Sequence, residues 1–418
     1  MGVRCQEGSD HGQFNGRCIK KRTRRDKASE EQPSRRAGQR FQLIAPILVP
    51  FFAHFGQDMQ QSFLLESFYA LIILLMEIPS GYFADRYGRV MVLRAGGLFW
   101  SLSWLSLIWV QDFSGLLGFY VLAGFGTSLL SGADLALLYD TERELQQDKP
   151  SRANRAVRNL FVIGMAAEGL ASLSATGLLF YGGITTVIAA QTVCGLLVLA
   201  AAMVLREPRR ANSGYSPIVG ECQNLGNVLS SLWRQSVLMR RLLVALCLWP
   251  VVTLLAVWLM QRVWVELDLT LLHFGWIWCV LQLVGALTGQ AAHAVERWIG
   301  SSPTIYMIGG LAVLGLLLMS GTTLSWVMVG GVLLFASRGL FSVLFMDALN
   351  RRIDSDYRAT INSLLGFGFR LGFIVAASAL GFVFDGFGLN ASVLTLSVFA
   401  LLVILALLVP LARDADST

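Results

Sequence analysis

Charge is scarce in this sequence. Only 14% of its 418 residues are Asp, Glu, Lys or Arg, whereas 55% are hydrophobic. A soluble chain of this length needs far more charge to cover its surface. The composition therefore excludes an ordinary soluble protein and indicates an integral membrane protein.

Motifs for metals, cofactors and catalysis are also missing. The six cysteines and four histidines do not have the spacing of a metal site, and we expect the cysteines to be free thiols. The sequence contains no P-loop and no dinucleotide-binding fingerprint. We therefore expect no cofactor, no metal and no enzymatic activity. An integral-membrane enzyme would need a cluster of nucleophilic or metal-binding residues, and none is evident.

Long apolar segments are what the sequence does contain. A helix needs about 20 mainly apolar residues to cross the hydrocarbon of a bilayer. Twelve segments are candidates, and the first and ninth are short. They are 41–57, 63–83, 92–110, 115–139, 159–180, 184–205, 242–261, 272–294, 304–320, 325–346, 361–384 and 389–411.

A polar segment divides these spans six and six. Residues 206–241 are rich in Gly, Asn and Ser and form the longest internal stretch without a span, which predicts a cytoplasmic linker. The two halves are then 41–205 and 242–411. Residues 1–40 are polar and basic, which predicts a disordered cytoplasmic tail or a start codon placed too early. Residues 412–418 form a short cytoplasmic tail.

Arginine and lysine are concentrated in alternate turns. The even-numbered turns carry nearly all of them, and the odd-numbered turns carry only Arg262. The positive-inside rule then predicts that both termini and the even-numbered turns are cytoplasmic, in a multi-pass protein of the cytoplasmic membrane. The same rule accounts for the net charge of +6, so we expect no nucleic-acid partner.

The turn after the second span carries the most specific pattern. Residues 77–89 read EIPSGYFADRYGR, which predicts a short charged turn at the membrane surface between two apolar runs. The spacing GxxxDRxGR is formed by Gly81, Asp85, Arg86, Gly88 and Arg89. In this context it resembles the loop between helices two and three of the major facilitator superfamily. A weaker related turn at 294–300 follows the eighth span, as expected of two repeated halves.

The resemblance implies an all-α membrane protein with twelve transmembrane helices in two pseudo-symmetric halves. It implies a secondary transporter that moves a small solute by alternating access, with spans 1, 4, 7 and 10 around a central cavity. It also implies a cytoplasmic gate. Asp85 would lie against the start of helix 11, and Arg89 would pair with Asp140 at the end of the fourth span.

Ionisable residues inside apolar spans cost about 2.5 to 3.5 kcal/mol each on insertion scales, so they mark places where charges pair, face a cavity or function. The candidates are Glu77, Asp134, Glu168, Arg338 and Arg370. Glu168 lies near mid-membrane and Asp134 lies on a cavity-lining span, which makes these two the candidates for proton coupling. Glu77 is expected to pack the second span.

Polar residues on the same spans are candidates for contact with the solute. They are Thr127, Ser131, Trp258, Gln261, Arg338 and Arg370. The alternative for each buried charge is a structural role, in which Arg338 or Arg370 bridges to Asp134 or Glu168 and no proton is carried.

Two departures from the resemblance concern antiport. The fourth span lacks the arginine, and the fifth the proline, of the patterns typical of drug/proton antiporters. We expect a monomer in the lipid bilayer whose partners are a small solute and protons. An uncoupled facilitator and a non-transporting receptor or scaffold are the alternatives.

Overall fold

The computed structural model describes most of the chain from residue 42 onward. The described residues are 42–144, 150–204, 233, 236–321, 323–353 and 358–416, and their side chains are described except at 78, 85, 132–144, 150–160, 358–360 and 415–416. Every regular element within these ranges is a helix. The predicted tail at 1–40 and most of the predicted linker lie outside the described residues.

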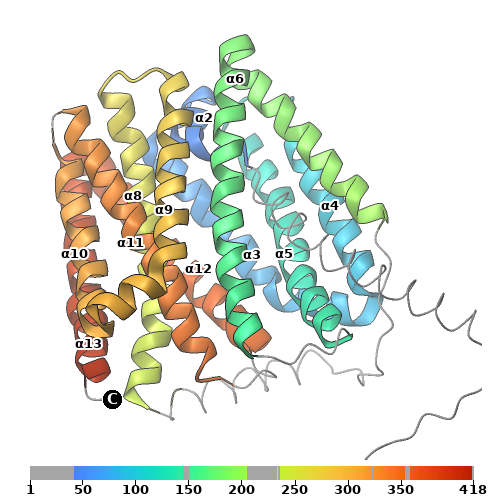
Figure 1. Cartoon of the computed structure of the whole chain (residues 1–418). Coiled ribbons are helices and arrows are strands. Elements are labelled where there is room, and N and C mark those ends of the chain that lie inside the picture. Colours follow the sequence, from blue (N-terminus) through green and yellow to red (C-terminus); the bar gives the residue numbers. More distant parts are fainter. Residues whose placement is uncertain are drawn as a thin grey trace, which may run out of the picture.

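The first half begins with two short helices and continues with four long ones (Figure 1). These are η1 (Ala45–Ile47), α2 (Leu48–His54), α3 (Met59–Tyr87), α4 (Arg89–Ser106), α5 (Phe113–Glu144) and α6 (Pro150–Val204). The backbone leaves helical geometry at Gly182 and Gly183, which divides α6 into the predicted fifth and sixth spans.

The second half begins with a long helix instead of two short ones. It contains α8 (Val237–Glu266), α9 (Leu271–Ile299), α10 (Ser301–Met319), α11 (Leu324–Asn350), α12 (Arg358–Val403), the π-helical segment η3 (Ile404–Leu408) and α13 (Val409–Asp416). Gly388, with φ 79°, breaks α12 at the predicted boundary between the last two spans. Helix α12 begins at Arg358, three residues before the predicted span 11.

The helices are long and apolar enough to form a membrane bundle. Among the described residues, eight stretches can cross a bilayer, and two of these, 161–204 and 361–414, are long enough to cross twice. Helix α4 and the short first segment complete the predicted set of twelve spans. Large apolar side chains such as Leu75, Phe180 and Val375 are more than 60% exposed, as expected where a bundle faces lipid.

The predicted turn at 77–89 is mostly helix, which corrects the sequence interpretation. Helix α3 continues through the charged motif to Tyr87 and contains Pro79, so only Gly88 leaves helical geometry. At its other end, α3 begins four residues before the predicted span. Asp58 accepts a hydrogen bond from the Gln61 amide at 2.7 Å, and Gln61 accepts one from the Asp58 amide at 3.1 Å.

Two equivalent glycines join consecutive helices in the two halves. Gly88 links α3 to α4 with φ 103°, and Gly300 links α9 to α10 with φ 93°. Both values lie where a side chain is strained, so glycine is required at both turns. The structure therefore shows the internal repeat that was only faint in the sequence. These turns lie at the lower end of the bundle in Figure 1.

Helix α8 begins inside the segment predicted as linker. Its first residue is Val237, and the Ser236 hydroxyl accepts a hydrogen bond from the Met239 amide at 3.1 Å, which caps the helix. Arg240 and Arg241 thus lie in the first two turns of a helix, although their charges suggested a loop. Arg241 pairs with Asp414 of α13 at 3.0 Å.

The first span is only half as long as a membrane crossing in the described residues. The ten residues Ala45–His54 span about 15 Å, against about 30 Å of hydrocarbon. A side chain of the second half holds this segment. Gln261 of α8 accepts from the Val49 amide at 3.0 Å and donates to the Ala45 carbonyl at 2.8 Å. In addition, Gln191 of α6 accepts from the Leu43 amide at 2.8 Å.

Candidate functional site

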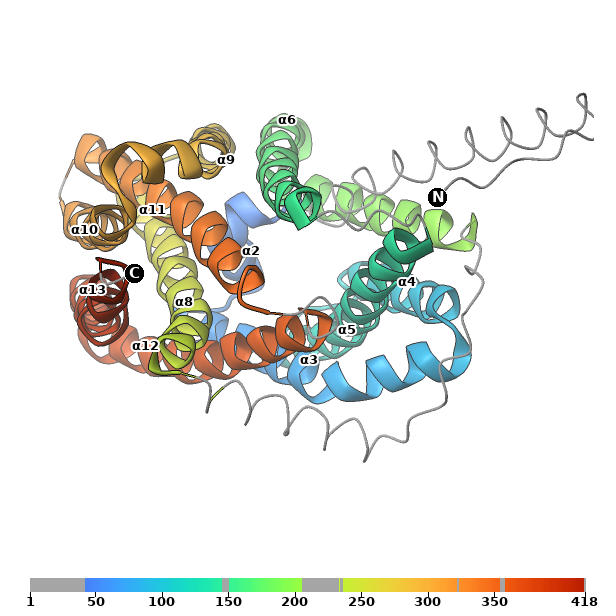
Figure 2. The same cartoon turned by 60° about the horizontal axis from the view of Figure 1, so that its bottom comes forward.

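The two halves meet along two pairs of helices on opposite sides of the bundle (Figure 2). Helix α3 packs against α12 on one side, and α6 packs against α9 on the other. We call these contacts the α3–α12 seam and the α6–α9 seam. Each seam carries polar contacts between side chains that are far apart in the sequence.

The α3–α12 seam contains an ion pair. Arg370 Nη1 of α12 lies 2.8 Å from Glu77 Oε2 of α3, and their side chains are only 17% and 19% exposed. Two and a half turns nearer the upper end, the hydroxyls of Ser67 and Ser378 hydrogen-bond across the same seam at 3.2 Å. Two of the five ionisable residues singled out in the spans are therefore partners that hold the halves together.

The α6–α9 seam contains a carboxylate and a carboxamide. Gln282 Nε2 of α9 donates a hydrogen bond to Glu168 Oε2 of α6. Gln282 is 1% exposed, and its Oε1 has no hydrogen-bond partner among the residues whose side chains are described. Gly169 of α6 faces Gln282 and Cys279 here, and a Cβ added at this position would make ordinary van der Waals contact with both residues.

Aromatic rings join the halves nearer the upper end. The Trp258 ring of α8 stacks on Phe63 of α3 at 5.4 Å and lies 5.8 Å from Phe52 of α2. All three side chains are at most 3% exposed. This Phe52–Phe63–Trp258 cluster therefore packs the two halves together near the upper end.

A second carboxylate of α3 was missed from the sequence. Glu66 Oε1 accepts a hydrogen bond from the Tyr120 hydroxyl of α5 at 2.7 Å. Beside it, the Tyr69 hydroxyl bonds to Thr127 Oγ1 at 2.7 Å, and the rings of Tyr69 and Tyr120 lie 5.3 Å apart. The available signal was a single acid within the apolar run at 63–76, which resembled an uninterrupted span.

The predicted solute-contact residues are dispersed. Thr127 bonds to the Tyr69 hydroxyl beside Glu66. Trp258 belongs to the Phe52–Phe63–Trp258 cluster. Gln261 is 1% exposed and binds the backbone of the first span through both ends of its amide. Ser131 is exposed and bonds to the Ser128 carbonyl, whereas the Arg338 guanidinium lies 5.8 Å from the Phe335 ring centroid.

The predicted cytoplasmic gate is described in part. The backbone places Gly81, Asp85 and Arg86 on the last turns of α3, before Gly88 and the first residue of α4, Arg89. Arg86 donates to the Tyr82 hydroxyl at 3.2 Å. The side chains of Asp85, Asp134 and Asp140 lie outside the described ones, so the predicted contacts of these acids stay predictions.

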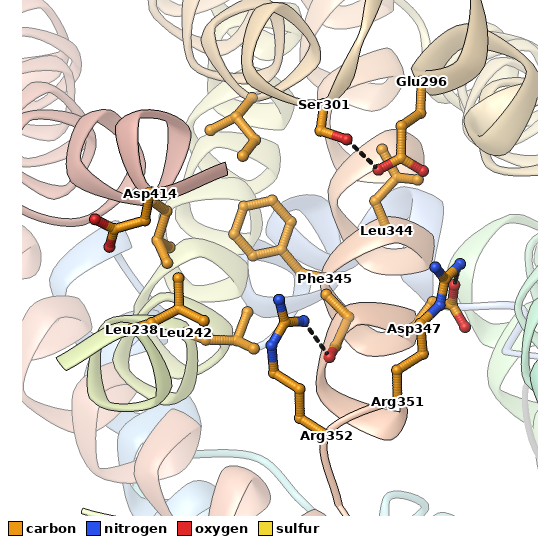
Figure 3. Close-up of a pocket in the computed structure, with 13 residues that line it drawn as sticks. Leu238, Leu242, Glu296, Ser301, Leu344, Phe345, Asp347, Arg351, Arg352 and Asp414 are labelled. Atoms are coloured by element: carbon orange, nitrogen blue, oxygen red, sulfur yellow. Dashed lines mark hydrogen bonds and ion pairs between the residues drawn. The ribbon is translucent and has the colours of Figure 1, made fainter. Parts of the chain in front are cut away.

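A pocket of about 260 Å³ opens at the lower end, within the second half (Figure 3). Leucines of α8 and Phe345 of α11 form its apolar side. Its polar side includes Glu296, which accepts from Ser301 at 3.1 Å, and Asp347, which pairs with Arg351 at 2.5 Å. Because both seams lie elsewhere, this pocket is not part of the interface between the halves.

Two repeated six-span halves that meet along polar seams are an architecture typical of membrane transporters. The sequence profile of the Major Facilitator Superfamily matches residues 39–377. The chain therefore belongs to this superfamily, and the resemblance seen in the GxxxDRxGR motif is confirmed. A search among curated proteins finds no significant match.

Solved structures support the same fold. The nucleoside transporter NupG superimposes with a TM-score of 0.67 at 12% identity, covering 90% of this chain and 98% of that one. The human organic anion transporter MFSD10 (TETRAN) superimposes with a TM-score of 0.60 at 17% identity, covering 90% and 97%. At these identities the likeness concerns the fold alone.

Proposed function

We propose that this protein is a proton-coupled secondary transporter of a small solute in the cytoplasmic membrane, with Glu168 as the main proton-carrying residue. Membrane transport follows from the superfamily. The orientation follows from the arginine-rich turns, which put the lower end and both termini in the cytoplasm. The solute would bind between the halves, and the halves would rock about the two seams.

The hydrogen bonding of Gln282 is the observation that supports coupling at Glu168. An ionised Glu168 accepts from Gln282 Nε2 but leaves the buried Gln282 Oε1 without a donor, which costs about 1–3 kcal/mol. A protonated Glu168 carries an O–H that could donate to Oε1 while the other bond is kept. Protonation would thus complete the contact across the α6–α9 seam, and proton release would weaken it.

The gates would act at opposite ends of the bundle. The Phe52–Phe63–Trp258 cluster would close the outer side, and the Asp85, Arg89 and Asp140 latch would close the cytoplasmic side in the outward-facing state. Asp134 is the second candidate for proton transfer, because it lies on the fourth span near the latch. The Glu77–Arg370 pair would hold the α3–α12 seam.

The solute must be identified first, and thermal-shift screening of the purified protein at two pH values can do this. Proteoliposomes would then measure accumulation driven by a pH gradient and exchange at equal pH. Glu168→Gln mimics the protonated acid and preserves both hydrogen bonds to Gln282. We expect it to abolish gradient-driven accumulation while exchange and folded yield remain.

Glu266→Gln is the matched control. Glu266 is an exposed acid at the end of α8 and pairs with Arg262, one turn earlier on the same helix. This change should leave both activities intact. Accumulation that survives in Glu168→Gln and in Asp134→Asn would contradict the coupling proposal and favour an uncoupled facilitator. Absence of solute flux in the unmodified protein would favour a receptor or scaffold.

A further inference from the structure

We infer that Glu66, with the rings of Tyr69 and Tyr120, binds a positively charged amine or ammonium group of the solute. This inference rests on the proposed transport function and specifies the chemical class of its substrate. It concerns a residue distinct from the proton-coupling candidates Glu168 and Asp134.

Glu66 lies on the side of α3 that faces away from lipid. Leu75 is 63% exposed and marks the lipid-facing side of this helix. Glu66 precedes it by two and a half turns, about 180° around the axis, so it points toward the interior of the protein. Its side chain is partly exposed, unlike its neighbours Leu65 and Ser67, which are 0% and 5% exposed. The exposed part therefore lies on the side of α3 opposite the lipid-facing Leu75.

Glu66 forms no ion pair with any residue whose side chain is described. Its hydrogen-bond donor there is the Tyr120 hydroxyl. Glu77, three turns farther along the same helix, pairs with Arg370 at 2.8 Å. The same helix thus presents one neutralised carboxylate and one that a positively charged ligand would neutralise.

The surroundings of Glu66 suit an organic cation. Tyr120 is 4% exposed, and its ring packs 4.9 Å from Phe119 and 6.3 Å from Phe52, while the Tyr69 hydroxyl is held by Thr127. These contacts fix the rings beside the carboxylate. A cation within about 6 Å of an aromatic face is attracted to it, and the attraction grows when water is excluded.

A ligand at Glu66 would also touch the parts that join the halves. Ser67, the next residue, bonds to Ser378 across the α3–α12 seam. Phe52 lies between Tyr120 and Trp258, at 6.3 Å and 5.8 Å from them. Binding at Glu66 is therefore transmitted directly to the α3–α12 seam and to the Phe52–Phe63–Trp258 cluster.

The test uses the full chain in nanodiscs and sets of three molecules that share one carbon skeleton. Each set contains a primary amine, the corresponding alcohol and the corresponding carboxylate, for example phenethylamine, 2-phenylethanol and phenylacetate. Thermal unfolding and binding titration are measured with each compound. We expect amines to stabilise the protein and the alcohols and carboxylates to have no effect.

Glu66→Gln should weaken amine binding by about tenfold or more, since a charge-assisted contact is lost. Tyr120→Phe keeps the carboxylate and should weaken binding less, and Glu266→Gln should not change it. If Glu66→Gln does not fold, Glu66→Asp and Tyr120→Phe replace it, and both should lower the affinity. Amine binding that is unchanged in these variants, or a panel in which no amine binds, would overturn the inference.

Uptake into proteoliposomes separates this inference from the transport proposal. Amines that bind through Glu66 but are not transported would leave the site standing and contradict transport. Transport of a neutral or anionic solute that persists in Glu66→Gln would leave transport standing and contradict the site.

Discussion

Arg370 and Glu77 are 293 residues apart in sequence, yet their side chains meet at 2.8 Å across the α3–α12 seam. Removing either side chain leaves the charge of the other one unpaired and mostly buried between the two helices. We expect Glu77→Gln or Arg370→Gln alone to lower the free energy of unfolding by about 2 kcal/mol, less than for a fully buried pair because both side chains keep some exposure.

The double variant with both changes should be more stable than either single one. Denaturant unfolding of the four proteins gives the coupling between the two sites. Additive losses would show that the pair does not stabilise the seam.

The latch prediction concerns Asp85, Arg89 and Asp140. Asp85→Asn, Arg89→Ala and Asp140→Asn should each reduce transport about tenfold or more with little loss of folded protein, because each removes a charge-assisted contact from the outward-facing state only. Exchanging the residues at 89 and 140 should restore part of the activity. Normal transport by all three single variants would rule out the latch.

The two glycine turns allow a matched stability test. Gly300→Ala should lower the free energy of unfolding by about 1–3 kcal/mol, because a side chain is strained at φ 93°. Gly310→Ala, inside helix α10 that follows this turn, meets no atom within 4 Å and should be neutral or slightly stabilising. Equal effects of the two changes would show that the turn conformation is not what requires glycine.

The topology prediction follows from the arginine distribution. Residues 1–40, 85–91, 141–158 and 206–241 should face the cytoplasm. Single cysteines at Ser151 and at Ser325, introduced into a cysteine-free background, should react oppositely with a membrane-impermeant reagent applied to intact cells. Equal labelling of both positions would contradict the proposed orientation.

The sequence was sufficient to predict the fold because lipid imposes a simple rule. Apolar length identifies the spans, and the breaks at Gly182–Gly183 and Gly388 fall within a residue or two of the predicted boundaries. The end of α3 was harder to predict. Charged residues at 85–89 indicated a turn, but a helix tolerates charge where it leaves the membrane, and only Gly88 ends it.

The site was less predictable, because its contacts join distant segments. No local pattern indicates that Arg370 pairs with Glu77, or that Gln282 faces Glu168, since these partners are brought together only when the halves pack. Glu66 was overlooked for a related reason. One acid does not alter the apolar character of a span, and the hydroxyl that binds it belongs to another helix.

The amide of Gln261 has a consequence for the rate of transport. It holds Val49 and Ala45 of the first span from the opposite half, while Gln191 holds Leu43 from the same half. Parting the halves at the upper end must break both bonds to Gln261 at once, because a single side chain makes them. Under the proposed alternating access, we therefore expect Gln261 to lengthen the lifetime of the state in which the halves are joined at this end.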